Sequence, residues 1–118
     1  MDKLHVGMTP WDFSRLSAKN LADQAVFVED LGLDSFWLPE NHFGEHAIPD
    51  PLTLLGAISG VTSRIKLGTT SYLLTLRNPI QAAEQVAVLD HLCEGRLILG
   101  VGRGFAPEML KAFHVPIA

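Results

Sequence analysis

The sequence has little of what several protein classes require. It contains one cysteine among 118 residues, so no intrachain disulfide can form. Charged residues make up only 19% of the chain and the formal net charge is −4, which argues against a basic face for nucleic acid. No apolar run approaches the roughly 20 residues that cross a bilayer. The first residues, MDKLHVGM, lack the basic-then-apolar form of a signal peptide. We therefore expect a reduced, cytoplasmic protein that binds neither nucleic acid nor membrane.

Hydrophobic residues, by contrast, make up 47% of the chain. That share, together with the low charge, is typical of a globular protein and excludes a disordered one. A chain of this length supports one domain, which buries roughly two-thirds of the surface that the unfolded chain exposes. We therefore expect residues 1–118 to form a single domain.

Four strand-like apolar runs follow one another at a regular spacing. They begin near residues 4, 35, 65 and 96, and the segments between them have helical periodicity. Residues 17–31 place their apolar side chains on one broad face. Asp50 and Asn78 each supply a capping side chain before a proline at a first helical position, and a fourth helix is expected from Pro107. Strands that alternate with helices predict four βα units with parallel strands, an α/β fold.

Two architectures fit this order of elements. A flavodoxin-like sheet suits the length but usually has five strands. Runs about 30 residues apart suit a (β/α)8 barrel, because eight such units make up the roughly 250 residues typical of that fold. The chain would then hold the first half of a barrel, with two unpaired strand edges and an uncovered inner face. In both folds the chemistry belongs to the loops that follow the strands, here residues 9–16, 39–50 and 72–78.

The second helical segment, residues 51–61, is apolar nearly all round. A helix that is apolar on every side is buried on every side, which indicates an assembly. Gly56 and Gly60 lie four residues apart and would let another helix approach closely. An ordinary crowded core helix with two glycines explains the same pattern, so the sequence leaves both interpretations open.

The longest loop, residues 39–50, gathers groups suited to acid–base chemistry. His42, Glu45 and His46 spell the inverted zincin pattern, which needs a helix to bring both imidazoles to one side. Gly44 and the flanking prolines exclude that helix, so we expect no metal site. A histidine that acts as a general acid or base fits better, because a free imidazole titrates near neutrality. Histidines that are merely solvated are the alternative.

Two later strand ends combine small residues with a cation. Residues 68–71, Gly-Thr-Thr-Ser, suit a shelf under a planar cofactor. Residues 100–104, Gly-Val-Gly-Arg-Gly, miss the dinucleotide-binding spacing because Phe105 stands where a glycine or alanine is needed. What remains is a glycine-lined strand end in which Arg103 can hold a phosphate or carboxylate. A turn with a surface arginine is the alternative. We expect Arg77, just before the third helix, to lie at the surface.

Taken together, these segments resemble the N-terminal half of the bacterial luciferase-like, flavin-dependent monooxygenase family. The likeness rests on four stretches in the family's order and spacing: GLDSFWLPENHF (residues 32–43), IKLGTTSYLL (65–74), NPIQAAEQVAVLDHLCEGRLILGVGRG (78–104) and APEMLKAFHV (106–115). The resemblance implies a (β/α)8 barrel that binds FMN, or a deazaflavin in some branches, at its C-terminal mouth. It also implies reduced flavin supplied by a separate reductase, O2, a small organic substrate, and homo-oligomers packed through helices of this first half.

The resemblance implies cofactor-binding residues as well. Thr70 and Ser71 fall where the family often has a non-prolyl cis peptide against the flavin ring. Gly102 falls where luciferases have a reactive cysteine. Arg103 falls where luciferases place an arginine that serves the phosphate end of the flavin.

One departure from the family concerns the catalytic residue. Asn41 stands where luciferases have their catalytic histidine, and an amide neither takes nor gives a proton at neutral pH. His42 matches the histidine that follows and is the catalytic candidate. We expect half a barrel to be inactive alone. Two alternatives stay open: a non-catalytic half-barrel that self-associates, and a deazaflavin-dependent oxidoreductase of the same fold.

Overall fold

The computed structural model describes residues 2–12 and 16–117. Its four strands are parallel and lie in the order β1-β2-β3-β4. The strands are β1 (Gly7–Met8), β2 (Ser35–Leu38), β3 (Lys66–Leu73) and β4 (Leu97–Gly102). The helices are α1 (Ala18–Asp30), α2 (Pro51–Ser59), the 3-10 turn η1 (Leu74–Leu76), α3 (Pro79–Leu92) and α4 (Pro107–Ala112). The predicted series of four βα units is confirmed, although the first strand is much shorter than its apolar run. Residues 13–15 of the first predicted loop lie outside the described residues.

The helices begin where the sequence predicts, because a polar side chain caps each of the first three. Ser17, Asp50 and Asn78 each accept a hydrogen bond from a backbone N–H two or three residues further on, at 3.2, 3.2 and 2.9 Å. These bonds satisfy N–H groups that a first helical turn leaves without a partner. The turn after α1 contains Gly32 at φ +83°, a conformation that side chains with a Cβ avoid.

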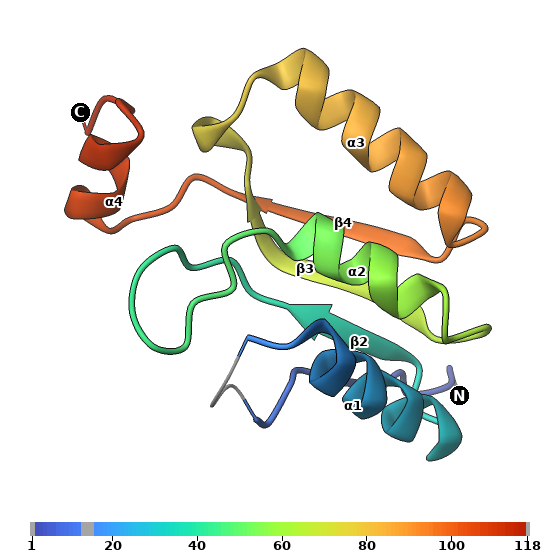
Figure 1. Ribbon diagram of the computed structural model, residues 1–118. Coiled ribbons are helices and arrows are strands. Elements are labelled where there is room, and N and C mark those ends of the chain that lie inside the picture. The colour runs from blue at the N-terminus through green and yellow to red at the C-terminus, as the bar shows by residue number, and fades with distance from the viewer. Residues whose placement is uncertain (1, 13–15, 118) are drawn as a thin grey trace.

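The main core lies between the sheet and helices α1, α2 and α3, which cover one of its faces (Figure 1). The strands contribute Phe36, Leu38 and Leu67, all fully buried. The helices contribute Leu21, Ala25, Val28, Leu52, Leu55, Ile58, Ala82 and Leu89. A second, smaller cluster holds α4 through Met109 and Leu110. Cys93 is buried in the main core, where a small apolar side chain fits.

The sheet is open along both edges and on its second face. β1 and β4 are the outer strands, and within residues 2–12 and 16–117 no fifth strand pairs with either. On β4, Ile98 and Val101 are 40% and 56% exposed. The indole of Trp37, on β2, lies across the neighbouring strands β1 and β3. It is so close to Gly7 and Gly68 that a Cβ at either position would collide with it. Four strands therefore form an open layer rather than a closed one.

Helix α2 is buried on one side only. Leu52, Leu55 and Ile58 face the core, whereas Ala57 is exposed and Val61, just after the helix, is 55% exposed. The composition predicts burial on every side of this helix, and that prediction is wrong for α2 within this chain. None of the described helices is both long and apolar enough to cross a bilayer.

Two side chains tie together the ends at which the strands begin. Arg96 is buried and donates five hydrogen bonds, to the backbone oxygens of Ser59, Thr62, Ile65 and Cys93 and to the hydroxyl of Thr62. Glu29, at the end of α1, accepts backbone N–H bonds from residues 63–65, the shortest at 2.7 Å. Burial raises the pKa of Glu29, but these N–H donors outweigh it and hold the pKa below its ordinary value.

The lowered pKa of Glu29 predicts a pH-dependent contribution to stability. Because the folded pKa is lowered, that contribution is complete above the pKa of unfolded glutamate, about 4.3, and is lost as the pH falls through the folded pKa. We expect Glu29→Gln to lower the free energy of unfolding by about 1 kcal/mol at pH 7. Urea denaturation at pH 7 and at pH 4 measures the difference, which should shrink on acidification. The exposed Glu84→Gln change is the control, and an equal loss there would contradict the assignment.

Candidate functional site

A cavity of about 560 Å³ lies where β2, β3 and β4 end. Because the strands are parallel, their C-terminal ends meet at one edge of the sheet, the end at which α4 and the loop of residues 39–50 also lie (Figure 1). Six of the residues that the sequence singles out line this cavity: Asn41, His42, Thr70, Ser71, Gly102 and Arg103. Glu45 and His46, further along the same loop, are not among its lining residues. Apolar side chains, among them Phe43, Leu73 and Met109, complete much of its wall. The cavity therefore joins three parts of the chain that are distant in sequence: the loop after β2, the last residues of β3, and the segment from the end of β4 into α4.

Strands β3 and β4 form one wall of the cavity through small residues. The peptide bond between Thr70 and Ser71 is cis, as the family resemblance implies. The pairing of β3 with β4 shifts register between Thr69 and Tyr72, around this bond. A Cβ at Gly102 would collide with the Ser71 hydroxyl as that side chain is placed, so glycine at this position lets the hydroxyl lie against β4. The result is a low wall of backbone and hydroxyl groups that leaves room for a flat molecule.

Arg103 follows β4 at the rim of the cavity. Its side chain is exposed, and Nη2 donates to the backbone oxygens of Pro116 and Ile117 at 3.1 and 2.9 Å. Its own carbonyl oxygen accepts a 2.6 Å bond from the hydroxyl of Thr75, which ties the end of β4 to the turn after β3. Exchanging two neutral carbonyls for an anion would strengthen the bonds of this guanidinium, because charge-assisted bonds are the stronger kind.

The loop of residues 39–50 is not helical, as predicted, and Asn41 closes it. Asn41 pairs with Ile48 in an isolated antiparallel bridge, and its side chain donates to the His46 carbonyl at 3.1 Å. The same side chain accepts the Ile48 N–H at 2.9 Å. Asn41 therefore uses both ends of its amide to hold the loop. Within the described ranges, no three His, Cys, Asp or Glu side chains are grouped to hold a metal.

A fully buried carboxylate, that of Glu40, lies at the end of β2. One of its oxygens is 2.8 Å from Nε2 of His42 and 2.7 Å from Nη1 of Arg77. The other accepts the backbone N–H of Leu73 at 2.7 Å. The expectation that Arg77 lies at the surface is wrong, because its side chain is only 18% exposed and its positive charge is directed to this buried carboxylate.

Aromatic rings enclose the same cluster. The Arg77 guanidinium carbon lies 4.0 Å from the centre of the Tyr72 ring, and Nη1 also donates to the Leu73 carbonyl at 2.9 Å. Burial raises the pKa of the Tyr72 phenol, and the nearby Arg77 charge offsets part of that rise. The His42 ring meets the edge of Phe113, from the turn after α4, with centroids 4.7 Å apart. His42 is therefore held by a hydrogen bond on one side and an aromatic contact on another.

Sequence reasoning missed the partners of His42. Arg77 stands 37 positions beyond Glu40, and nothing local marks either residue as one of a pair. One signal was present: both residues follow the ends of adjacent strands, and parallel topology brings such positions together. Nothing in the sequence indicated that Phe113 contacts His42, because this contact depends on how α4 packs against the sheet.

Loss of the Arg77 charge should destabilise the fold strongly. Arg77→Ala leaves the Glu40 carboxylate buried without its cation, so we expect the free energy of unfolding at pH 7 to fall by about 3 kcal/mol. Urea denaturation measures this change. Lys19→Ala removes an exposed ion pair with Asp23, 2.7 Å long, and should cost under about 0.5 kcal/mol. Equal losses for the two variants would contradict a buried pair.

Comparison with known proteins places this geometry in a family. The luciferase-like monooxygenase family matches residues 6–118. The alkanal monooxygenase beta chain of Photorhabdus laumondii is 34% identical over 92 residues, which cover 77% of this chain and 28% of that protein. An F420-dependent glucose-6-phosphate dehydrogenase of Kineococcus radiotolerans is 45% identical over 92 residues, covering 73% of this chain and 27% of that protein.

A solved structure agrees with the sequence comparison. The oxygenating constituent of 3,6-diketocamphane monooxygenase from Pseudomonas putida, determined with FMN, superimposes with a TM-score of 0.84 at 26% identity. The match covers 94% of this chain and 32% of that one, so the chain spans about a third of such a protein. The four βα units are thus the first part of a (β/α)8 barrel, and the flavodoxin-like alternative is excluded. The chain belongs to the luciferase-like monooxygenase family, whose members are flavin-dependent monooxygenases and oxidoreductases.

Proposed function

We propose that this chain forms the first half of the active site of a monooxygenase that uses reduced FMN and O2 to oxidise a small organic molecule. The observation that carries the proposal is the cavity at the strand ends, where a wall of small residues, a cation and a histidine meet. A bound reduced flavin supplies the electrons for the reaction with O2. The second half of such a site comes from later βα units, so we expect this chain alone to bind flavin weakly and not to turn over.

The residues of the cavity suit distinct parts of that cofactor. Thr70 and Ser71 would offer backbone and hydroxyl groups to a flat ring, and Gly102 adds no side chain to the cavity wall beside Ser71. Arg103 suits the phosphate end, where its present carbonyl partners would give way to an anion. His42, 10% exposed at the side chain, is the residue that would hold or move a proton.

The proposed reaction needs a source of reduced flavin and an organic substrate. Reduced FMN would come from a separate reductase, as the resemblance to the family implies. The proposed location is the cytoplasm, where such a reductase and reduced flavin are available. The substrate is small and organic, in keeping with the apolar side chains of Phe43, Leu73 and Met109 in the cavity wall.

A deazaflavin is the second candidate cofactor. The relative at 45% identity is an F420-dependent dehydrogenase, which favours this alternative over unrelated ones. The two candidates differ in how they use oxygen. A deazaflavin-dependent oxidoreductase would transfer hydride without consuming O2, whereas the proposed monooxygenase consumes one O2 for each substrate oxidised.

Binding of FMN and riboflavin tests the cofactor proposal. We expect fluorescence titration of the form of the protein that binds flavin to show FMN binding that Arg103→Gln weakens about 10-fold, the loss of one charge-assisted bond. Riboflavin, which lacks the phosphate, should bind the wild type and the variant alike. The matched control is Arg64→Gln, because Arg64 also donates to two backbone carbonyls but lies at the opposite end of the strands. Equal weakening of both ligands by Arg103→Gln would contradict the phosphate assignment.

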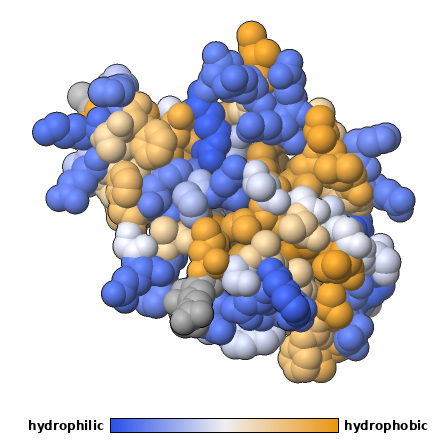
Figure 2. Space-filling view, viewed as in Figure 1, coloured by the Kyte–Doolittle hydropathy of each residue, from blue (hydrophilic) through white to orange (hydrophobic). Residues whose placement is uncertain are grey.

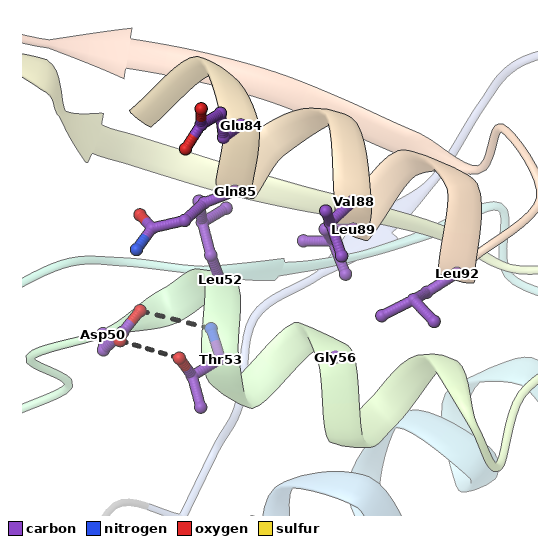
Figure 3. Close-up of a pocket in the computed structure, with 9 residues that line it drawn as sticks. All are labelled: Asp50, Leu52, Thr53, Gly56, Glu84, Gln85, Val88, Leu89 and Leu92. Carbon is purple, nitrogen blue, oxygen red and sulfur yellow. Dashed lines mark hydrogen bonds between the residues drawn. The ribbon is translucent and has the colours of Figure 1, made fainter. Parts of the chain in front are cut away.

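We also propose that the protein is a homodimer packed through α2 and α3. Apolar side chains gather over these helices on one face of the molecule (Figure 2). A groove of about 390 Å³ lies between them, floored at Gly56, with Val88 and Leu92 of α3 directed into it (Figure 3). Val88 and Leu92 are 59% and 61% exposed, and a Cβ at Gly56 would meet nothing within 4 Å. A second copy would cover these groups and the open side of α2.

Sedimentation equilibrium tests the dimer. Leu92→Asp places a charge in the groove and should weaken association at least about 10-fold, since one desolvated carboxylate costs more than 1.4 kcal/mol. Leu31→Asp alters an equally exposed leucine, 58% exposed at the end of α1, and should leave association unchanged. A wild type that is monomeric at all concentrations would contradict the proposal. A stable dimer that binds no flavin in any form would instead favour a non-catalytic, self-associating half-barrel.

A further inference from the structure

We infer that Glu40 is a positioning residue that fixes the tautomer of His42 and leaves Nδ1 as the proton-accepting atom of the site. This inference rests on the proposed function and specifies which atom of His42 acts. Its basis is the 2.8 Å contact between His42 Nε2 and a Glu40 carboxylate oxygen, made by a carboxylate with no exposed surface.

The chemistry of the two groups determines the direction of this hydrogen bond. An ionised carboxylate only accepts hydrogen bonds, so the proton between the two atoms belongs to Nε2. A neutral imidazole carries one N–H, and with Nε2 protonated its Nδ1 keeps a lone pair. In the described part of the chain, no hydrogen bond is made by His42 Nδ1. That atom is the free acceptor of a ring that lines the cavity.

The partners of Glu40 hold its carboxylate in place. Arg77 places a guanidinium nitrogen 2.7 Å from the oxygen that also meets His42. The backbone N–H of Leu73 holds the second oxygen at 2.7 Å, so both oxygens are used. Three donors from the ends of two adjacent strands therefore converge on one acceptor-only group. A carboxylate held in this way cannot rotate to release His42 without breaking a bond to β3 or to Arg77.

The proposed proton transfer uses both nitrogens of the His42 ring. An O–H or N–H group of a molecule in the cavity gives its proton to Nδ1 and keeps the bonding electron pair. The ring becomes an imidazolium with N–H groups at both nitrogens, and the Glu40 carboxylate beside Nε2 stabilises its positive charge. The Phe113 ring packs against the imidazole in a T-shaped arrangement, with the two centroids 4.7 Å apart. This contact opposes a flip of the His42 ring that would exchange Nδ1 and Nε2. Glu40 does not itself touch the reacting molecule in this scheme and acts through His42.

Nitrogen NMR of the histidine rings tests the inference on this chain without flavin. At a pH at which the ring is neutral, long-range ¹H–¹⁵N spectra of the wild type should show His42 with Nε2 protonated and Nδ1 unprotonated. The His42 signals are identified by their loss in His42→Gln. In Glu40→Gln the amide has one accepting oxygen for three donors, and His42 is the only partner that can become an acceptor. We expect its tautomer to shift toward Nδ1–H in this variant, while the exposed Glu45→Gln leaves it unchanged.

The possible results separate this inference from the proposed function. A wild-type ring that is protonated at Nδ1, or a tautomer that Glu40→Gln does not alter, would overturn the inference whatever the enzyme does. If Glu40→Gln fails to fold, the wild-type spectrum alone decides. In the form of the protein that turns over, Glu40→Gln and His42→Gln should each lower kcat about 100-fold with little change in KM, and the double variant no further. Unchanged kcat in both variants, with the tautomer as expected, would overturn the catalytic role of His42 in the proposed function and leave the positioning by Glu40 intact.

Discussion

The buried carboxylate of Glu40 is the interaction on which the functional end of this molecule depends. A negative charge with no exposed surface is stable only if its partners replace the water it has lost. Here those partners come from three places: the backbone of β3 at Leu73, the guanidinium after η1 at Arg77, and the ring of His42. Satisfying one charge thereby fixes the relative positions of the β2 loop and the end of β3, and with them one side of the cavity.

Parallel topology makes this convergence possible. Each crossover helix returns the chain to the same starting end, so every strand delivers its last residues to the same edge. The opposite end of the sheet is held by different means. Arg96 and Glu29 bind backbone groups there, and neither lines the cavity at the functional end. Both ends of the strands are therefore held by buried or partly buried charged side chains, and only the end with Glu40 and Arg77 also lines the cavity.

Much of the site could be predicted, and the reason is local. Gly102 and Arg103 lie where β4 ends, a place that an apolar run and glycines mark in the sequence. Thr70 and Ser71 were expected at the end of a strand, but β3 continues to Leu73, so both lie within it. The contact between Gly102 and the Ser71 hydroxyl could not be predicted, because it depends on how β3 and β4 pair. The role of Asn41 was also hidden, since its amide contacts Ile48 seven residues away across a loop without regular structure.

The sequence by itself determined the elements and their order. The caps at Ser17, Asp50 and Asn78 act within one helical turn, so the local sequence is enough to predict them. The alternation of strands and helices can be predicted from the spacing of the apolar runs alone. Tertiary structure alone decided which charges are buried and which groups meet. The sequence predicts that Arg77 lies at the surface, but in the folded chain its Nη1 is 2.7 Å from the carboxylate of Glu40. The physical reason is that burial and pairing depend on contacts between residues more than 30 positions apart, and those contacts exist only once the sheet has formed.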